Sequence, residues 1–339
     1  MLQTSQIFFH GIYAEIKRFC LSRIPGEAAE SRCAAPGATE LSHTSAGLRR
    51  RLARRIFISI YFLELVGASA ITALGYVACS LLQIDWSRSA PLWFAGYLFV
   101  YNSDRLYADP ADATNTPLRF SWAPRLRPLR VTLIWLSAGI LVLWPLVTAR
   151  GWMLFPLTAG IGTLWFYSRP IFRAGYRIKD LPYVKSLLAP GVIASILVIW
   201  PAFESGKLAE PSVWLVIIWV FLVLTLNALI FDYRDIPGDI AAGTKTIAAV
   251  LGRAGTKGLL CSLAGVVVLI SIQLAQLRLA GPLIPALLAL GCAGLLGSLR
   301  FRLAPVLLSL LADLLLFLPA IGYWLSQAML ACIAHKFLA

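Results

Sequence analysis

The sequence predicts an all-α integral membrane fold with nine transmembrane helices. Hydrophobic residues make up 59% of the 339 residues, whereas soluble domains contain roughly 45–50%. Several apolar runs reach the roughly 20 residues that a helix needs to cross a bilayer core about 30 Å thick. The runs lack the alternation of β-barrel strands, so backbone polar groups in lipid must be paired within helices.

Nine apolar runs follow one another between residues 57 and 327. The second run is short unless it continues into the acidic residues after it. Three longer loops are expected at 104–130, 169–185 and 232–256. The runs cover about 57–82, 90–103, 131–149, 152–168, 186–202, 212–231, 257–277, 280–298 and 304–327.

Residues 1–55 differ in composition from the rest of the chain. Between residues 26 and 48 they are rich in Ala, Gly, Ser and Glu and show no helical period, which is typical of a flexible segment. Residues 6–20 indicate either a helix on the membrane surface or a disordered start. We expect residues 1–55 to form a cytoplasmic extension and residues 56–330 to form one domain.

Basic residues outnumber acidic ones by 30 to 16, which gives a net charge of +14. Nucleic-acid binding is not the explanation we favour, because Lys and Arg collect in alternate loops when each run crosses once. This positive-inside pattern predicts a multi-pass protein of a bacterial inner membrane, with the N-terminus and both acidic stretches in the cytoplasm. On the other side fall only Arg88, Arg150, Lys207, Arg278 and Lys336.

Six of the 16 acidic residues lie in two short stretches, each directly after an apolar run. In the second stretch, Asp232, Asp235 and Asp239 are spaced i, i+3, i+7, which places them on one face of a helix. Crowded carboxylates repel one another, and a divalent cation removes that repulsion. Mg²⁺ binds one or two carboxylates together with water and phosphate oxygens. The alternative is a solvated acidic loop, with the helix ending at Pro237-Gly238.

The segment from Asn227 to Gly252 resembles the second Asp-rich motif of the UbiA family of intramembrane prenyltransferases. That motif has the approximate form DxxD(x)xGD, then small residues, KT and LG; here it reads DYRDIPGD from Asp232, KT from Lys245 and LG from Leu251. The resemblance implies helices around a central lipid-accessible cavity, with Asp motifs after the second and sixth. It also implies two Mg²⁺ ions that hold an isoprenoid diphosphate.

The first acidic stretch departs from the family's pattern, N(D)xxDxxxD. Leu and Pro stand four and eight residues after Asn102, where the pattern has acids. Asp104 and Asp112 keep the outer spacing of eight, and Asp109 is displaced by one residue. We expect a divergent active branch rather than an inactive one. The expected metal ligands are Asp104, Asp109, Asp112, Asp232, Asp235 and Asp239, of which Asp104, Asp112, Asp232 and Asp235 are the expected catalytic residues.

Other polar side chains are expected to bind the diphosphate, because metal ions neutralise only part of its charge. Bases in the loop at 169–185 are equally well explained by positive-inside anchoring, so both interpretations stay open. The expected set is Asn102, Arg105, Arg119, Arg173, Arg177, Lys179, Lys185 and Lys245.

Three further polar residues, Glu64, Asn227 and Asp313, lie within predicted spans. Intramembrane carboxylates usually face a cavity or a partner. Glu64 and Asp313 could orient an acceptor or take up a proton, or each could be neutral and hydrogen-bonded to a neighbouring helix. Asn227 lies about one turn before Asp232 and could line the same cavity.

The resemblance implies Mg²⁺-dependent transfer of a prenyl group from an isoprenoid diphosphate to a lipophilic acceptor, such as an aromatic or quinone precursor. Two alternatives are a terpene cyclase that uses no acceptor and a catalytically inactive homologue. A cation transporter is disfavoured, because transporter sites usually lie near the midplane between repeats. The expected partners are therefore the diphosphate, the acceptor and membrane lipid, and no nucleic acid.

Overall fold

The computed structural model describes residues 52–106, 110–148, 150–168, 183–277, 279–301 and 303–338. The chain separates into two compact units, Met1–Arg55 and Ile56–Ala339, and the second contains nearly all described residues. Within the described ranges every regular element is a helix, which confirms the all-α prediction.

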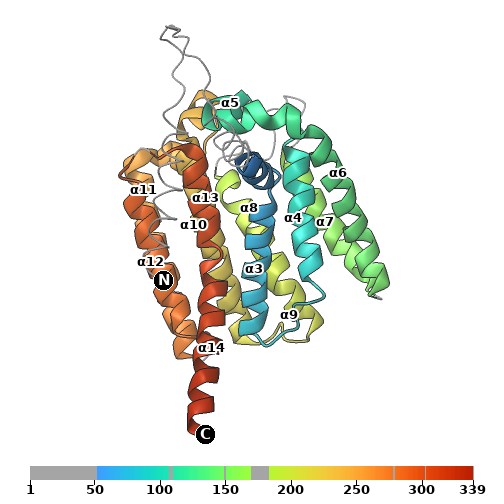
Figure 1. The fold of residues 1–339 in the computed structure, drawn as a ribbon, viewed down its shortest axis with the longest axis vertical. Helices are drawn as coiled ribbons and strands as arrows, with labels where there is room; N and C mark the ends of the chain where they lie inside the picture. Colours follow the sequence, from blue (N-terminus) through green and yellow to red (C-terminus); the bar gives the residue numbers. More distant parts are fainter. Residues whose placement is uncertain are drawn as a thin grey trace, which may run out of the picture. The chain divides into compact units, whose positions relative to one another are not determined.

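Figure 1 shows the helices in chain order. A helix at Leu52–Phe62 comes first. It is followed by α3 (Leu65–Leu81), α4 (Ala90–Asp104), α5 (Pro110–Asn115), α6 (Pro117–Val147), η1 (Gly151–Met153), α7 (Leu154–Ser168), α8 (Val184–Ala194), η3 (Ser195–Ile199), α9 (Trp200–Glu204), α10 (Pro211–Ala241), α11 (Ile247–Gln276), α12 (Leu283–Ser298), α13 (Pro305–Leu315) and α14 (Leu318–Leu338).

Among the described residues, five helical stretches are long and apolar enough to cross a membrane. A sixth is the pair formed by Leu52–Phe62 and α3, which is bent by 56° at a short break. The remaining predicted runs fall on α4, α7 and α12, which have 15, 15 and 16 residues. These lengths are below the roughly 20 residues of a full crossing. A multi-pass membrane protein is therefore confirmed, and the count of nine spans stays a prediction.

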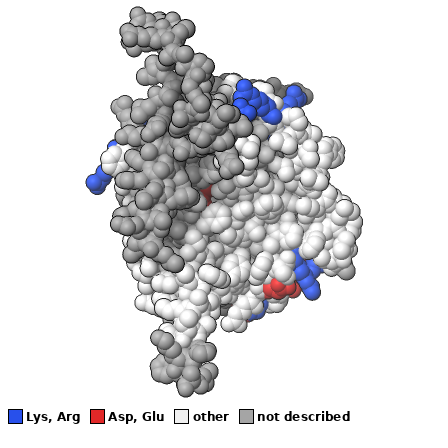
Figure 2. Space-filling view, viewed as in Figure 1, with Lys and Arg blue, Asp and Glu red and all other residues white. Residues whose placement is uncertain are grey.

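The surface of the described helices fits a lipid environment. On the face in Figure 2, most charged side chains lie near the helix ends, and a broad uncharged surface separates them; a small acidic area is visible between the ends. Large apolar side chains point outward from α6 and α7, such as Trp135, which is 73% exposed, and Phe155, which is 81% exposed. Extended apolar surfaces of this kind mark contact with lipid or with other proteins.

Helix α10 has a central place because it packs against α3, α5, α8, α11 and α13. Its Trp219 is fully buried and donates its indole N–H to Ser271 Oγ on α11 at 2.8 Å. At the end of the bundle opposite the acidic stretches, charged side chains pair with each other. Arg150, for example, lies 2.5 Å from Glu204. The carboxyl end of α10, by contrast, meets α5, so both acidic stretches lie at one end of the helices.

Candidate active site

A break between the first two helices shapes one side of the site. Glu64 has a left-handed backbone with φ of 65°, which L-residues rarely adopt without a structural reason. The break leaves backbone carbonyls without helical partners. The Asn102 amide donates to Leu63 O at 3.1 Å, and Arg130 donates to Phe62 O at 3.4 Å. Asn102 and Arg130 are both buried, so they fix this strained segment.

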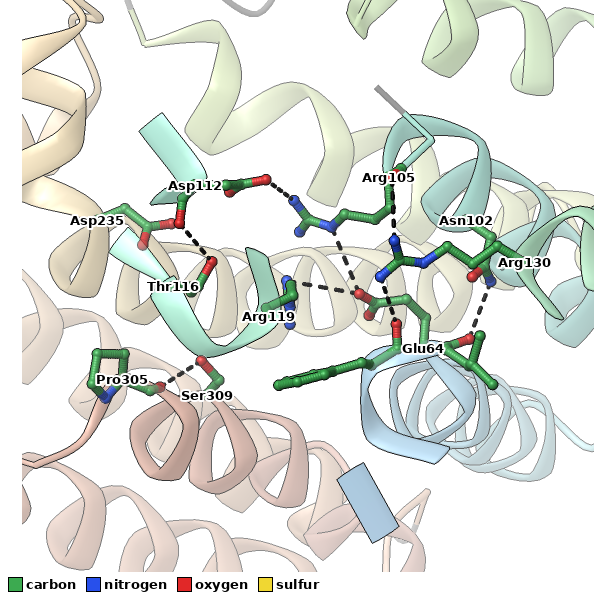
Figure 3. Close-up of polar contacts among 12 residues, drawn as sticks. Glu64, Asn102, Arg105, Asp112, Thr116, Arg119, Arg130, Asp235, Pro305 and Ser309 are labelled. Carbon is green, nitrogen blue, oxygen red and sulfur yellow. Dashed lines mark hydrogen bonds and ion pairs between the residues drawn. The ribbon is translucent and has the colours of Figure 1, made fainter. Parts of the chain in front are cut away.

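The side chain of Glu64 faces two guanidinium groups (Figure 3). Its Oε1 lies 3.8 Å from Arg105 Nε and 3.7 Å from Arg119 Nη1. The contacts of Glu64 are therefore ion pairs, in place of the hydrogen bond to a neighbouring helix that the sequence left open. Arg105 also reaches Asp112 of α5, with 3.2 Å between Arg105 Nη1 and Asp112 Oδ2. Burial disfavours a charged guanidinium, but Asp112 and Glu64 outweigh it and raise the pKa of Arg105.

The second acidic stretch lies on the last turns of α10. The helix continues through Pro237 to Ala241, so the alternative in which it ends before Asp239 is wrong. Asp232 accepts a hydrogen bond from Ser186 of α8 at 2.5 Å, and Asp239 accepts one from Thr246 at 3.2 Å.

The third carboxylate of this stretch, Asp235, has a different partner. It receives two hydrogen bonds of 2.7 Å from Arg234, the residue before it, and Arg234 also donates to Ser309 of α13. The three carboxylates of this face are thus held by three different side chains, those of Ser186, Thr246 and Arg234.

The two acidic stretches meet where α5 packs on α10. Asn115 Oδ1, at the end of α5, accepts the backbone N–H of Gly238 at 2.9 Å. A Cβ atom on Gly238 would lie 2.4 Å from the Asn115 amide, closer than any side chain tolerates. An alanine here would force the Asn115 side chain to shift, so the glycine of the second motif permits the close approach of the first.

Buried polar atoms without partners concentrate in this region. Buried polar groups are nearly always hydrogen-bonded. In the described part of the chain, the buried side-chain nitrogen and oxygen atoms that lack a hydrogen-bond partner are Tyr61 OH, Glu64 Oε1, Asn102 Oδ1, Ser103 Oγ, Arg105 Nε, Arg119 Nε and Arg130 Nε. The site is therefore built to receive a polar ligand or water.

The donor set fits Mg²⁺ bound together with a phosphate. Asn102 Oδ1 and the carboxylates of both stretches are the hard oxygen donors that Mg²⁺ prefers. No group of three His, Cys, Asp or Glu side chains converges as a metal cluster among the described residues. Mg²⁺ needs only one or two carboxylates when water and phosphate oxygens complete its shell. The residues fit a metal–diphosphate complex better than a bare ion.

An apolar groove lies between α7 and the α8–η3–α9 segment, which also carries Ser186, the partner of Asp232. Its volume is about 990 Å³, and it extends along the helix from Tyr183 to Phe203, which is about 30 Å at 1.5 Å per residue. The π-helical turn η3 lines its middle, just before Pro201, which lacks the N–H that a helix needs. The lining includes Gly160, Leu187, Gly191, Ser195 and Trp200.

The other expected site residues have mixed positions. Asn227 donates to Ala312 O at 2.9 Å and joins α10 to α13, where Asp313 is buried. Lys245 is exposed, and its carbonyl accepts the N–H of Tyr183 at 3.1 Å. Asp104 is the last residue of α4. Outside the described positions lie Asp109, Arg173, Arg177, Lys179 and the side chain of Lys185.

The sequence explains two arginines of the site, Arg130 and Arg234, only as positive-inside charges. Arg130 and Arg234 are buried or nearly so and contact the site residues described above. The signal that could have identified Arg234 is its place inside the second motif, directly before Asp235. For Arg130 the sequence offers no comparable signal, because its contacts depend on the fold.

Comparisons with known proteins agree with this architecture. No family model matches the chain. The apo structure of a UbiA homologue from Aeropyrum pernix K1 superimposes with a TM-score of 0.55 at 16% identity, covering 77% of this chain and 97% of that one. The likeness confirms the UbiA-like integral membrane fold.

A curated relative matches at the level of sequence. The somaliensene A/B synthase of Streptomyces somaliensis is 29% identical over 179 residues. The match covers 51% of this chain and 55% of the synthase, so the chain spans about half the length of that relative.

Proposed function

We propose that this chain, which has the UbiA fold, ionises an isoprenoid diphosphate inside the membrane with the help of Mg²⁺. The observation that carries the proposal is the docking of α5 on α10 through Asn115 and Gly238. It joins the two acidic stretches at one helix end, beside buried guanidinium groups. An apolar groove long enough for a prenyl chain lies alongside.

Each part of the site would have a separate task. Bound Mg²⁺ would neutralise charge on the diphosphate, and Asp112, Asp232 and Asp239 are the carboxylates that would hold it. Arg105 and Arg119 would bind the remaining phosphate oxygens. The bond between the allylic carbon and the diphosphate oxygen would break, its electron pair leaving with pyrophosphate, whose growing charge these groups stabilise.

The allylic cation has two possible fates. In transfer, a nucleophilic acceptor attacks it, as the family resemblance implies. In cyclisation, a double bond of the same chain attacks, and a proton is finally lost. Similarity to a terpene synthase favours cyclisation. In either fate a proton must be accepted, and buried Asp313 is a better candidate than Glu64, which already faces two guanidinium groups.

Product analysis tests the proposal and separates the two fates. Purified protein would be incubated with Mg²⁺ and prenyl diphosphates of increasing length, with and without a lipid extract. Pyrophosphate and a hydrocarbon formed without extract would identify a cyclase; products carrying the mass of an acceptor would identify a transferase. Absence of pyrophosphate release under every condition would refute both.

A further inference from the structure

Arg105 lies between two carboxylates from different parts of the site (Figure 3). It makes a hydrogen bond of 3.2 Å to Asp112 and lies 3.8 Å from Glu64. Asp112 is expected to bind Mg²⁺, and Arg105 is expected to bind diphosphate. In the structure these two side chains bind each other, so neither is available for its expected ligand.

The two contacts of Arg105 are unequal. The contact with Asp112 is a hydrogen bond, whereas Arg105 Nε and Glu64 Oε1 have no hydrogen-bond partner at all. Glu64 belongs to the strained break that Asn102 and Arg130 hold, and its side chain is 10% exposed. The Arg105 side chain is 22% exposed, so it has more room to move. Glu64 is thus the fixed anion and Arg105 the movable cation.

Charge balance makes the two expected ligands depend on each other. If Asp112 turned to Mg²⁺ alone, Arg105 would lose its hydrogen-bonded partner in a partly buried place, which is unfavourable. If a diphosphate entered alone, it would meet the carboxylates of Asp112 and Glu64. When the metal and the diphosphate enter together, neither cost arises, because Asp112 then contacts the metal and Arg105 contacts the diphosphate.

We propose that Arg105 exchanges partners when the substrate enters. It leaves Asp112 for a diphosphate oxygen, and Asp112 is thereby released to bind the metal. This exchange rests on the proposed function, because it assigns the order of contacts within the same site. It makes the metal and the diphosphate bind cooperatively, and such coupling is typically about fivefold or more.

A double-mutant cycle with Arg105→Gln and Asp112→Asn tests the exchange. The affinity for Mn²⁺ alone, followed by electron paramagnetic resonance of purified protein, is the readout, so no turnover is needed. Exchange predicts that Asp112→Asn changes Mn²⁺ affinity little while Arg105 is present. Arg105→Gln should tighten Mn²⁺ binding about fivefold, and adding Asp112→Asn should remove that gain.

A second titration follows inorganic pyrophosphate in the presence of chelator. Asp112→Asn should tighten pyrophosphate binding, because it leaves Arg105 without its partner, and Arg105→Gln should weaken it. Arg88→Gln, at an exposed pair with Asp85 at the other end of the bundle, is the matched control and should change neither affinity. Each variant is first compared with the wild type in melting temperature.

The outcomes separate the two proposals. An additive cycle, in which Asp112→Asn weakens Mn²⁺ binding equally with and without Arg105, would overturn the exchange and leave the proposed function standing. Failure of the wild type and of Arg105→Gln to bind Mn²⁺ or pyrophosphate would overturn both. Non-additive coupling through Asp112 would support both.

Discussion

Replacing Gly238 by alanine should separate the two acidic stretches. The added Cβ would lie 2.4 Å from both the nitrogen and the oxygen of the Asn115 amide, which is itself buried. Asn115 must therefore move, and the 2.9 Å hydrogen bond to the Gly238 N–H is lost. We expect both lower stability and lower turnover, because the first acidic stretch is then no longer held against the second.

The magnitude follows from three contributions. Overpacking a buried contact costs about 1–3 kcal/mol, and a buried donor left without its acceptor costs about 1–3 kcal/mol. Alanine within a helix is more favourable than glycine by about 1 kcal/mol, which offsets part of this loss of stability. The free energy of unfolding should therefore fall by about 1–5 kcal/mol, or roughly 2 °C in melting temperature for each kcal/mol.

Thermal unfolding of detergent-purified variants measures this effect. Gly265→Ala is the control, because Gly265 also lies inside a long helix but no atom lies within 4 Å of its added Cβ. It should not lower the melting temperature. Asn115→Ala in the Gly238→Ala background should recover part of the loss by removing the clash. A Gly238→Ala protein as stable as the wild type would show that the Asn115 side chain is not held against Gly238 in this way.

Three further predictions concern the metal site, the packing and the topology. Asp232→Asn and Asp239→Asn should each abolish Mg²⁺-dependent turnover with normal folding, whereas Asp85→Asn at the other end should not; full activity of both variants would exclude them as ligands. Gly322→Ala places a Cβ 2.9 Å from the Ile284 backbone and should destabilise the α12–α14 contact by about 1–3 kcal/mol; equal melting of the variant and wild type would contradict this packing. Cysteine labelling should report the α10–α11 connection as cytoplasmic and the α3–α4 connection as external, and the reverse result would refute the predicted orientation.

Part of the site could be predicted because it depends on local spacing. The i, i+3, i+7 arrangement of Asp232, Asp235 and Asp239 requires only that the helix continue, and it does so through Pro237. The long apolar runs likewise predict helices, because in lipid the backbone N–H and C=O groups of a single segment can be hydrogen-bonded only within a helix. Helix type and the second motif were therefore accessible from the sequence.

The rest of the site could not be predicted because it depends on contacts between distant segments. The role of Gly238 is visible only beside Asn115, which lies 123 residues earlier. The strained break at Glu64 depends on Asn102 and Arg130, and an ordinary apolar run gives no sign of it. Arg130 had an adequate explanation as a positive-inside charge, so its burial was not expected.

The arginines also offer a reason why the irregular first stretch can remain functional. Where the family's pattern has two further acids, this chain has Leu106 and Pro110. Around Glu64 and the break before α3 lie three guanidinium groups, those of Arg105, Arg119 and Arg130. They are buried or partly buried. Guanidinium groups bind phosphate oxygens directly and in pairs, so they can supply positive charge that metal ions would otherwise bring. If the proposed function is correct, a site with fewer carboxylates and more arginines would hold the diphosphate to a greater extent through the protein itself.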